Sequence, residues 1–167
     1  MDTTNREYYD LDQSPIDIVE DLAELRRWDV DRLGDDQIAM AIEGSWRTYS
    51  LSLAWFDPDE TLRMVCTYDF KPPEDRLSEL YKAMEAANDR IWIGGFNLWR
   101  EHDLVAYRYG LTLRGGAGST MEQVDQMLRS AVENCERFYP AFSLVAHEDA
   151  TTESALAAAL LEAQGSA

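Results

Sequence analysis

The stretch from residue 37 to residue 70 sets the strongest limit on the fold, because apolar residues there alternate with polar or small ones. The alternation runs over residues 38–42, 49–55 and 62–70, and short polar breaks separate the three runs. Successive side chains of a β-strand point to opposite faces, so a period of two predicts strands with one buried face. Because the connections are short, we predict a three-stranded antiparallel meander.

Helical spacing of the apolar residues precedes and follows this meander. Ser14 and Pro15 open a helix over residues 14–28, because Ser is a favoured N-cap and Pro suits the first helical position. Residues 73–90 return to the same spacing and predict a second helix.

Two further helices are expected in the last third of the chain. Ser119 and Glu122 have the spacing of a capping box, and apolar residues then recur to residue 142, with Pro140 expected to end or kink the helix. The Ala/Leu segment 151–163 predicts a short C-terminal helix, which is marginal alone and needs a surface to dock on.

Residues 91–114 predict a β-hairpin whose first strand is kinked or bulged at Gly94-Gly95. The acidic residues 29–36 are expected to be a solvated linker. The element order is therefore helix, three-stranded meander, helix, β-hairpin, helix and short C-terminal helix. It predicts an α+β fold with a five-stranded antiparallel sheet and helices on one face.

One hydrophobic core is expected, because the chain has 167 residues. We predict a mobile N-terminal arm over residues 1–13, a single α+β domain over 14–145, and a C-terminal tail with the short helix over 146–167.

Net charge excludes two classes of partner. The chain has 15 basic and 32 acidic residues, which gives a net charge of −17. Such a surface repels nucleic-acid phosphates and anionic membranes. We therefore expect neither nucleic acid nor a membrane as a partner.

The cysteine content favours a reducing compartment. Cys66 and Cys135 are too few for a disulfide framework. The sequence also shows no secretory signal and no apolar stretch of the roughly 18–20 residues that span a bilayer. A cytoplasmic protein is the expectation.

No residue pattern predicts catalysis, a cofactor or a metal. His102 and His147 lack partners at metal-ligand spacing, and Cys66 has no accompanying His or Asn pattern. The acids of 29–36 resemble a calcium loop only in part, because the remaining ligand positions hold apolar residues. The glycine-rich segment 114–120 lacks the Lys-Ser/Thr ending of a phosphate-binding loop, and a tight turn with a Ser cap accounts for it.

Clustered aromatic residues are the stronger functional signal. Trp92, Phe96 and Trp99 lie within eight residues, and exposed aromatic side chains often anchor a protein partner. The alternative is that one or more of them cover the core.

The segment 62–142 resembles the YbjN family, a group of bacterial proteins described as sensory transduction regulators. The resemblance rests on the order and spacing of several features and covers about residues 14–165. These features are Leu62-Arg63-Met64-Val65-Cys66, a helix ending at Asn88, a hairpin from Ile91 to Trp99 with an apolar return strand, Leu113-Arg114-Gly115-Gly116, and a helix containing Cys135-Glu136-Arg137-Phe138-Tyr139-Pro140-Ala141-Phe142.

The resemblance implies a fold like that of type III secretion chaperones, in which homodimers are common and the second helix and adjacent strand often form the dimer contact. By that analogy the contact maps to Tyr81, Met84, Trp92 and Phe96. The resemblance supplies no catalytic residues.

We therefore predict a non-enzymatic, cytoplasmic protein-interaction module that acts as a homodimer in bacterial signalling or stress response. Its protein partner is unknown, and its partner or dimer surface is expected at Tyr81, Met84, Trp92, Phe96 and Trp99. Two alternatives remain open: a secretion-type chaperone that binds a client protein, and a small-molecule sensor or enzyme with a site on the sheet.

Overall fold

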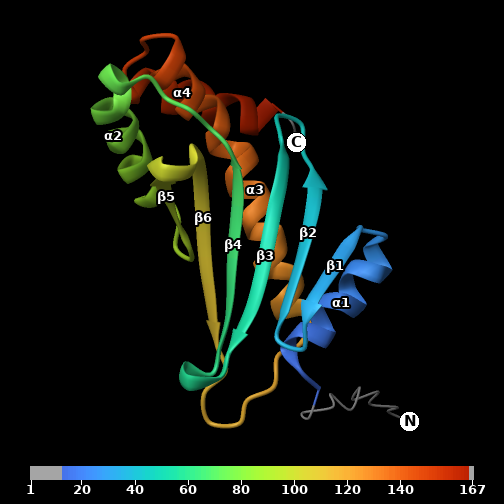
Figure 1. The fold of residues 1–167 in the computed structure, drawn as a ribbon. Helices are drawn as coiled ribbons and strands as arrows, with labels where there is room; N and C mark the ends of the chain where they lie inside the picture. The colour runs from blue at the N-terminus through green and yellow to red at the C-terminus, as the bar shows by residue number, and fades with distance from the viewer. Residues whose placement is uncertain (1–12, 166–167) are drawn as a thin grey trace.

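A computed structural model describes residues 13–165, and it confirms an α+β fold with an antiparallel sheet (Figure 1). The predicted mobile arm over 1–13 lies outside the described residues except for Gln13. The sheet has the strand order β1-β2-β3-β4-β6-β5. The elements are α1 (Pro15–Arg26), β1 (Val30–Gly34), β2 (Gln37–Glu43), β3 (Thr48–Phe56), β4 (Thr61–Asp69), α2 (Leu77–Asn88), β5 (Gly95–Trp99), β6 (Leu104–Thr112), α3 (Met121–His147) and α4 (Thr152–Gly165).

One face of the sheet packs against helices, and the other is open. In Figure 1, α3 runs behind the strands along the length of the sheet, and no described helix lies on the face toward the viewer. The covered face carries the large apolar residues of the alternating runs, which are buried against apolar residues of α3 such as Leu128, Phe138 and Phe142. The alternation of apolar and polar residues therefore indicates which side of each strand packs against α3.

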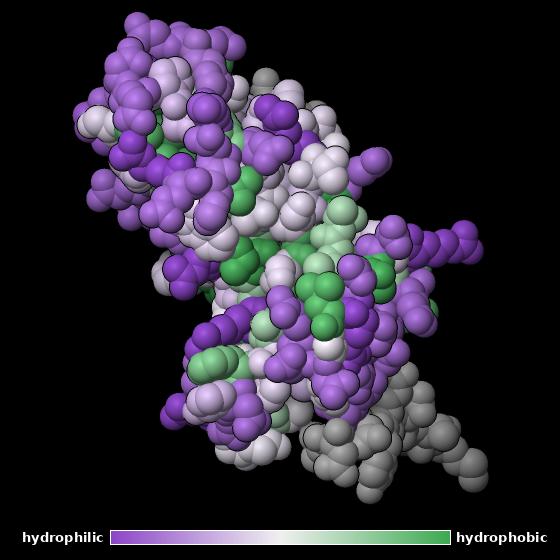
Figure 2. All heavy atoms as spheres, viewed as in Figure 1, coloured by the Kyte–Doolittle hydropathy of each residue, from purple (hydrophilic) through white to green (hydrophobic). Residues whose placement is uncertain are grey.

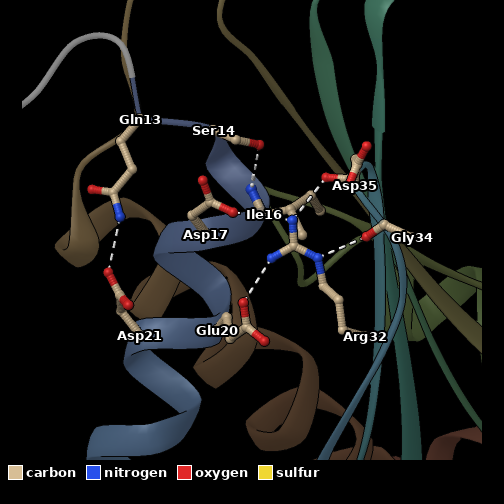
Figure 3. A network of polar contacts seen from close by, with 9 residues as sticks. All are labelled: Gln13, Ser14, Ile16, Asp17, Glu20, Asp21, Arg32, Gly34 and Asp35. Atoms are coloured by element: carbon tan, nitrogen blue, oxygen red, sulfur yellow. Dashed lines mark hydrogen bonds and ion pairs between the residues drawn. The ribbon is translucent and has the colours of Figure 1, made fainter.

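The sheet has six strands, so the prediction of five was wrong, as was the prediction of a solvated linker over 29–36. Val30 and Arg32 pair with Met40 and Ile38 of β2 and share their covered face. Arg32 forms ion pairs with Asp17 (3.0 Å) and Glu20 (2.7 Å) of α1 (Figure 3).

Arg32 also donates hydrogen bonds to the carbonyl groups of Gly34 and Asp35, at 2.7 and 2.9 Å. This edge strand is thus held against α1 by an arginine where an apolar side chain would be expected, and hydrophobic alternation could not reveal it.

The predicted N-cap of α1 is confirmed, whereas the predicted capping box of α3 is one residue out of place. The Ser14 hydroxyl accepts a hydrogen bond from the N–H of Ile16. The capping box of α3 joins Thr120 and Gln123, one residue later than predicted. This helix continues through Pro140 to His147, so the proline does not end it.

The two C-terminal helices share one core. α3 passes the predicted domain boundary at residue 145, and α4 packs against it. Ala155, Leu156 and Ala159 of α4 are buried in the same cluster as the sheet residues. The contact gives this short Ala/Leu helix the docking surface that it needs.

The free edge of β5 is blocked by a side chain. Asn88, the last residue of α2, accepts a hydrogen bond from the N–H of Phe96 (2.7 Å) and donates one to its carbonyl group (3.2 Å). These backbone groups would otherwise be available to a further strand. The sheet therefore cannot be extended at Phe96 while Asn88 stays in place.

Residues 91–94 form a loop, and β5 begins only at Gly95, so the predicted first strand of the hairpin is shorter than expected. Tyr107 donates a hydrogen bond to the carbonyl group of Ile93 at 2.6 Å. Gly94 has a φ of +80°, and a Cβ at this position would overlap the Tyr107 ring. A glycine is therefore required where the chain passes this tyrosine.

A polar clamp joins the β2–β3 turn to α3. The Glu136 carboxylate accepts hydrogen bonds from the Tyr49 hydroxyl (2.5 Å) and from the N–H groups of Ser45 (2.9 Å) and Trp46 (3.3 Å). Burial alone would raise the pKa of Glu136, but these donors outweigh burial and hold that pKa below its ordinary value. The turn passes so close that a Cβ at Gly44 would overlap Glu136 and Tyr49.

Candidate functional site: the open face of the sheet

Small residues line the middle of the open face, because they occupy the outward positions of the central strands. Ala39 and Ala41 project from β2, and Ser50 and Ser52 from β3, between covered-face residues that are buried. Figure 2 shows the middle of this face as an area of apolar and near-neutral residues bordered by hydrophilic ones. The sheet thus presents a weakly polar surface that no helix within residues 13–165 covers.

This face is hollowed. A depression of about 610 Å³ reaches from the region of β1 across β2, β3 and β4 to β5 and β6. Its floor is formed by the small residues, and half-buried Trp99 and Leu104 form one rim. Both its volume and its apolar lining with few polar groups fall in the range of ligand-binding sites.

A second depression of about 720 Å³ adjoins the first over β4, β6 and β5. Val65 and Trp99 line both hollows. The second hollow differs in charge, because Arg63 and Arg108 line it beside Gly95.

The two arginines are not equivalent. Arg63 pairs with Asp59, and its guanidinium lies 3.7 Å from the centroid of the Phe56 ring. The hydrogen bond from Arg63 holds the pKa of the Asp59 carboxyl below its ordinary value, although partial burial opposes this shift. The Arg108 side chain is exposed and has no ion pair, hydrogen bond or ring contact within residues 13–165. Arg108 is therefore free to bind an anionic group.

Comparison with known proteins now identifies the family. The YbjN family model, described as "Putative bacterial sensory transduction regulator", matches residues 15–144, which is most of the chain. The chain belongs to the YbjN family. The resemblance in the sequence is thereby confirmed.

A solved structure shares the YbjN fold. The crystal structure of YbjN from E. coli, described as "a putative transcription regulator", superposes with a TM-score of 0.58 and 13% sequence identity, covering 81% of this chain and 94% of that one. At this identity the likeness concerns the fold alone. No curated protein matches the sequence, and no described helix combines the length and apolar character needed to cross a bilayer.

The five residues predicted as a partner surface in this YbjN-family chain do not lie together. Trp99 lines both hollows of the open face. Trp92 is fully exposed (100%) on the loop before β5, and Tyr81 is exposed on α2. Met84 and Phe96 are buried in the core, so neither can contact a partner unless the fold opens.

The sequence did not indicate that the two histidines meet. His102 and His147 line one depression of about 340 Å³ together with Arg47 and Lys71, and Asp69 and Asp103 lie there too. Both histidines are exposed. The signal that could have joined them is their position, because His102 lies in the turn between β5 and β6, His147 is the last residue of α3, and both segments lie at the same end of the sheet (Figure 1).

Proposed function

We propose that this YbjN-family chain is a cytoplasmic, non-enzymatic regulator that binds a protein partner through the open face of its sheet. The observation that carries this proposal is the hollow lined by small residues and Trp99 on a face that no described helix covers. The family description as sensory transduction regulators supports a regulatory role. The free, buried cysteines suit a reducing compartment.

The face is a better docking surface than either edge of the sheet. Asn88 occupies the backbone groups of β5 at Phe96, and Arg32 binds two carbonyl groups at the end of β1. A partner is therefore expected to bind by side-chain contacts across the face, not by adding a strand.

Affinity capture from native cells with a matched pair of variants tests this proposal. Val65→Glu places a charge in the middle of the open face, whereas Leu25→Glu places one on exposed α1. We expect mass spectrometry to find a partner that wild type and L25E retain and V65E loses. An identical set of captured proteins for V65E and L25E would contradict the proposal.

We also propose that the chain forms a homodimer through the exposed residues beside β5. Trp92 is fully exposed, and Ile93 (54%) and Tyr81 (46%) are largely so. Exposed aromatic side chains of this kind are frequent anchors of interfaces. Light scattering should give twice the chain mass for wild type and the single mass for Trp92→Ser, while a wild-type monomer at high concentration would refute the dimer.

A further inference from the structure

We propose that the partner segment bound on the open face carries an acidic side chain at one end, a basic side chain at the other, and apolar residues between them. This inference rests on the proposed function and adds the chemistry of the segment. It is drawn from one row of residues that crosses the sheet.

The row is fixed by the strand register. Asp31 pairs with Ala39, Ala39 with Ser52, Ser52 with Val65, and Val65 with Arg108. Directly paired residues share a face of the sheet, so all five side chains lie on the open face. The row thus has a carboxylate at one end, a guanidinium at the other, and uncharged side chains between them.

Both charged ends are available to a partner. Asp31 and Arg108 are exposed, and neither side chain has an ion pair or hydrogen bond to another residue in the range 13–165. The other arginine of the open-face strand positions, Arg63, is already paired with Asp59. A partner can therefore pair with both ends without breaking an existing contact, and the planar guanidinium of Arg108 matches a carboxylate.

The length of the row sets the length of the segment. Asp31 and Arg108 are four strand spacings apart, which corresponds to about 19 Å at roughly 4.8 Å per spacing. About six residues of an extended peptide, or about 13 residues of a helix, span this distance. Between the ends, the hollow of about 610 Å³ has room for apolar side chains over Ala39, Ser52 and Val65.

The charge pattern argues against other occupants. A nucleic acid offers only negative charge, which would meet Asp31 and a chain of net charge −17. A uniformly basic segment would place a cation against Arg108. A segment with both charges satisfies both ends of the row.

Selection from a phage-displayed library of random 16-residue peptides, with the full chain as bait, tests the inference without a known partner. We expect the enriched peptides to carry an acidic and a basic residue on either side of an apolar stretch. Their affinity should fall at least tenfold for the double variant Asp31→Arg/Arg108→Asp, which keeps the net charge. The matched control Arg27→Asp/Glu85→Arg exchanges two exposed charges outside the open face and should bind as wild type does.

Reversing the charge on the peptide and on Arg108 in turn tests whether the acidic residue of the peptide contacts Arg108. Replacing the acidic residue of a selected peptide with Lys should abolish binding to wild type and restore binding to Arg108→Asp. Melting temperatures equal to that of wild type will show that these variants remain folded.

The outcomes separate this inference from the proposed function. Peptides that V65E fails to bind, but that lack the charge pair or ignore the D31R/R108D exchange, would overturn the inference and leave open-face docking intact. Peptides that bind V65E as tightly as wild type, or a library without binders, would overturn both. A wild-type dimer that V65E converts to a monomer would assign the face to a second copy and overturn the inference.

Discussion

The two faces of the sheet are built from the same strands but differ in side-chain size and in what covers them. On β3, Leu51 and Leu53 are buried beneath α3, whereas Ser50 and Ser52 face the open hollow. Large side chains on the covered face exclude water over a wide area, and that burial is the main source of stability. The open face contributes little burial, so its residues can change with little effect on the fold. Positions that are buried against the helices and positions that are open thus lie a single residue apart along each strand.

The strongest test of this difference between the two faces is a pair of truncations, one on each face. Leu53→Ala removes a fully buried side chain from the covered face and should lower the free energy of unfolding by about 2–5 kcal/mol. Val65→Ala removes a half-buried side chain from the open face and should cost less than about 1 kcal/mol. Urea denaturation measures both free energies of unfolding. Equal losses in the two variants would contradict the conclusion that the covered face supplies most of the stability.

A second test concerns how tightly the covered side is packed at the β2–β3 turn. Gly44→Ala places a Cβ against the Glu136 carboxylate and the Tyr49 ring, and we expect a loss of about 1–3 kcal/mol in unfolding free energy. Gly34→Ala is the control, because a Cβ there meets only Asp36 Oδ1, at 3.6 Å. If the two variants melt at the same temperature, the turn is not packed as described.

The polar clamp at this turn makes the free energy of unfolding depend on pH. The pKa of Glu136 is lowered in the folded chain, so its contribution is complete above the ordinary pKa of 4.5 and is lost as the pH falls through the folded value. Glu136→Gln should cost about 1 kcal/mol at pH 7 and should lack this part of the acid sensitivity. Unfolding curves from pH 7 to pH 3 measure it, and parallel profiles for variant and wild type would refute the clamp.

The smallest effect is expected at the charged end of the open face. Arg108→Asp should change the unfolding free energy by less than about 0.5 kcal/mol, because the exposed arginine has no partner within the described range. A chemical denaturation curve that overlays that of wild type will support this expectation. A marked loss of stability would mean that Arg108 belongs to the fold and not to a binding surface.

Hydrophobic pattern predicted the parts of the fold in which apolar side chains do the packing. The strands β2, β3 and β4 were predictable because their covered-face residues are large, as Met40, Leu53 and Met64 are. The strand β1 was not, because Arg32 occupies a covered-face position and binds acids of α1. The shift of the capping box to Thr120 shows a second limit, since adjacent Ser and Thr residues are equally good caps by type.

The open face was harder to predict than the fold. The clustering of Trp99 with Trp92 and Phe96 predicts a partner surface, and of these three residues only Trp99 lines the two hollows. Ala, Ser and Thr at outward positions look the same whether a face is covered by water or by a partner. The row from Asp31 to Arg108 emerges only from the register of five strands, because its ends lie far apart along the chain.

The two cysteines offer an internal probe of how α3 separates from the sheet. Cys66 on β4 and Cys135 on α3 are both buried, with sulfur atoms 3.8 Å apart. The hydrogen bond with the Cys66 thiol, together with burial, raises the pKa of Cys135 well above its ordinary value. A thiol-modifying reagent can therefore react only during moments when the helix lifts away. Alkylation rates at these native cysteines would therefore measure how often α3 separates from the sheet, without an engineered cysteine.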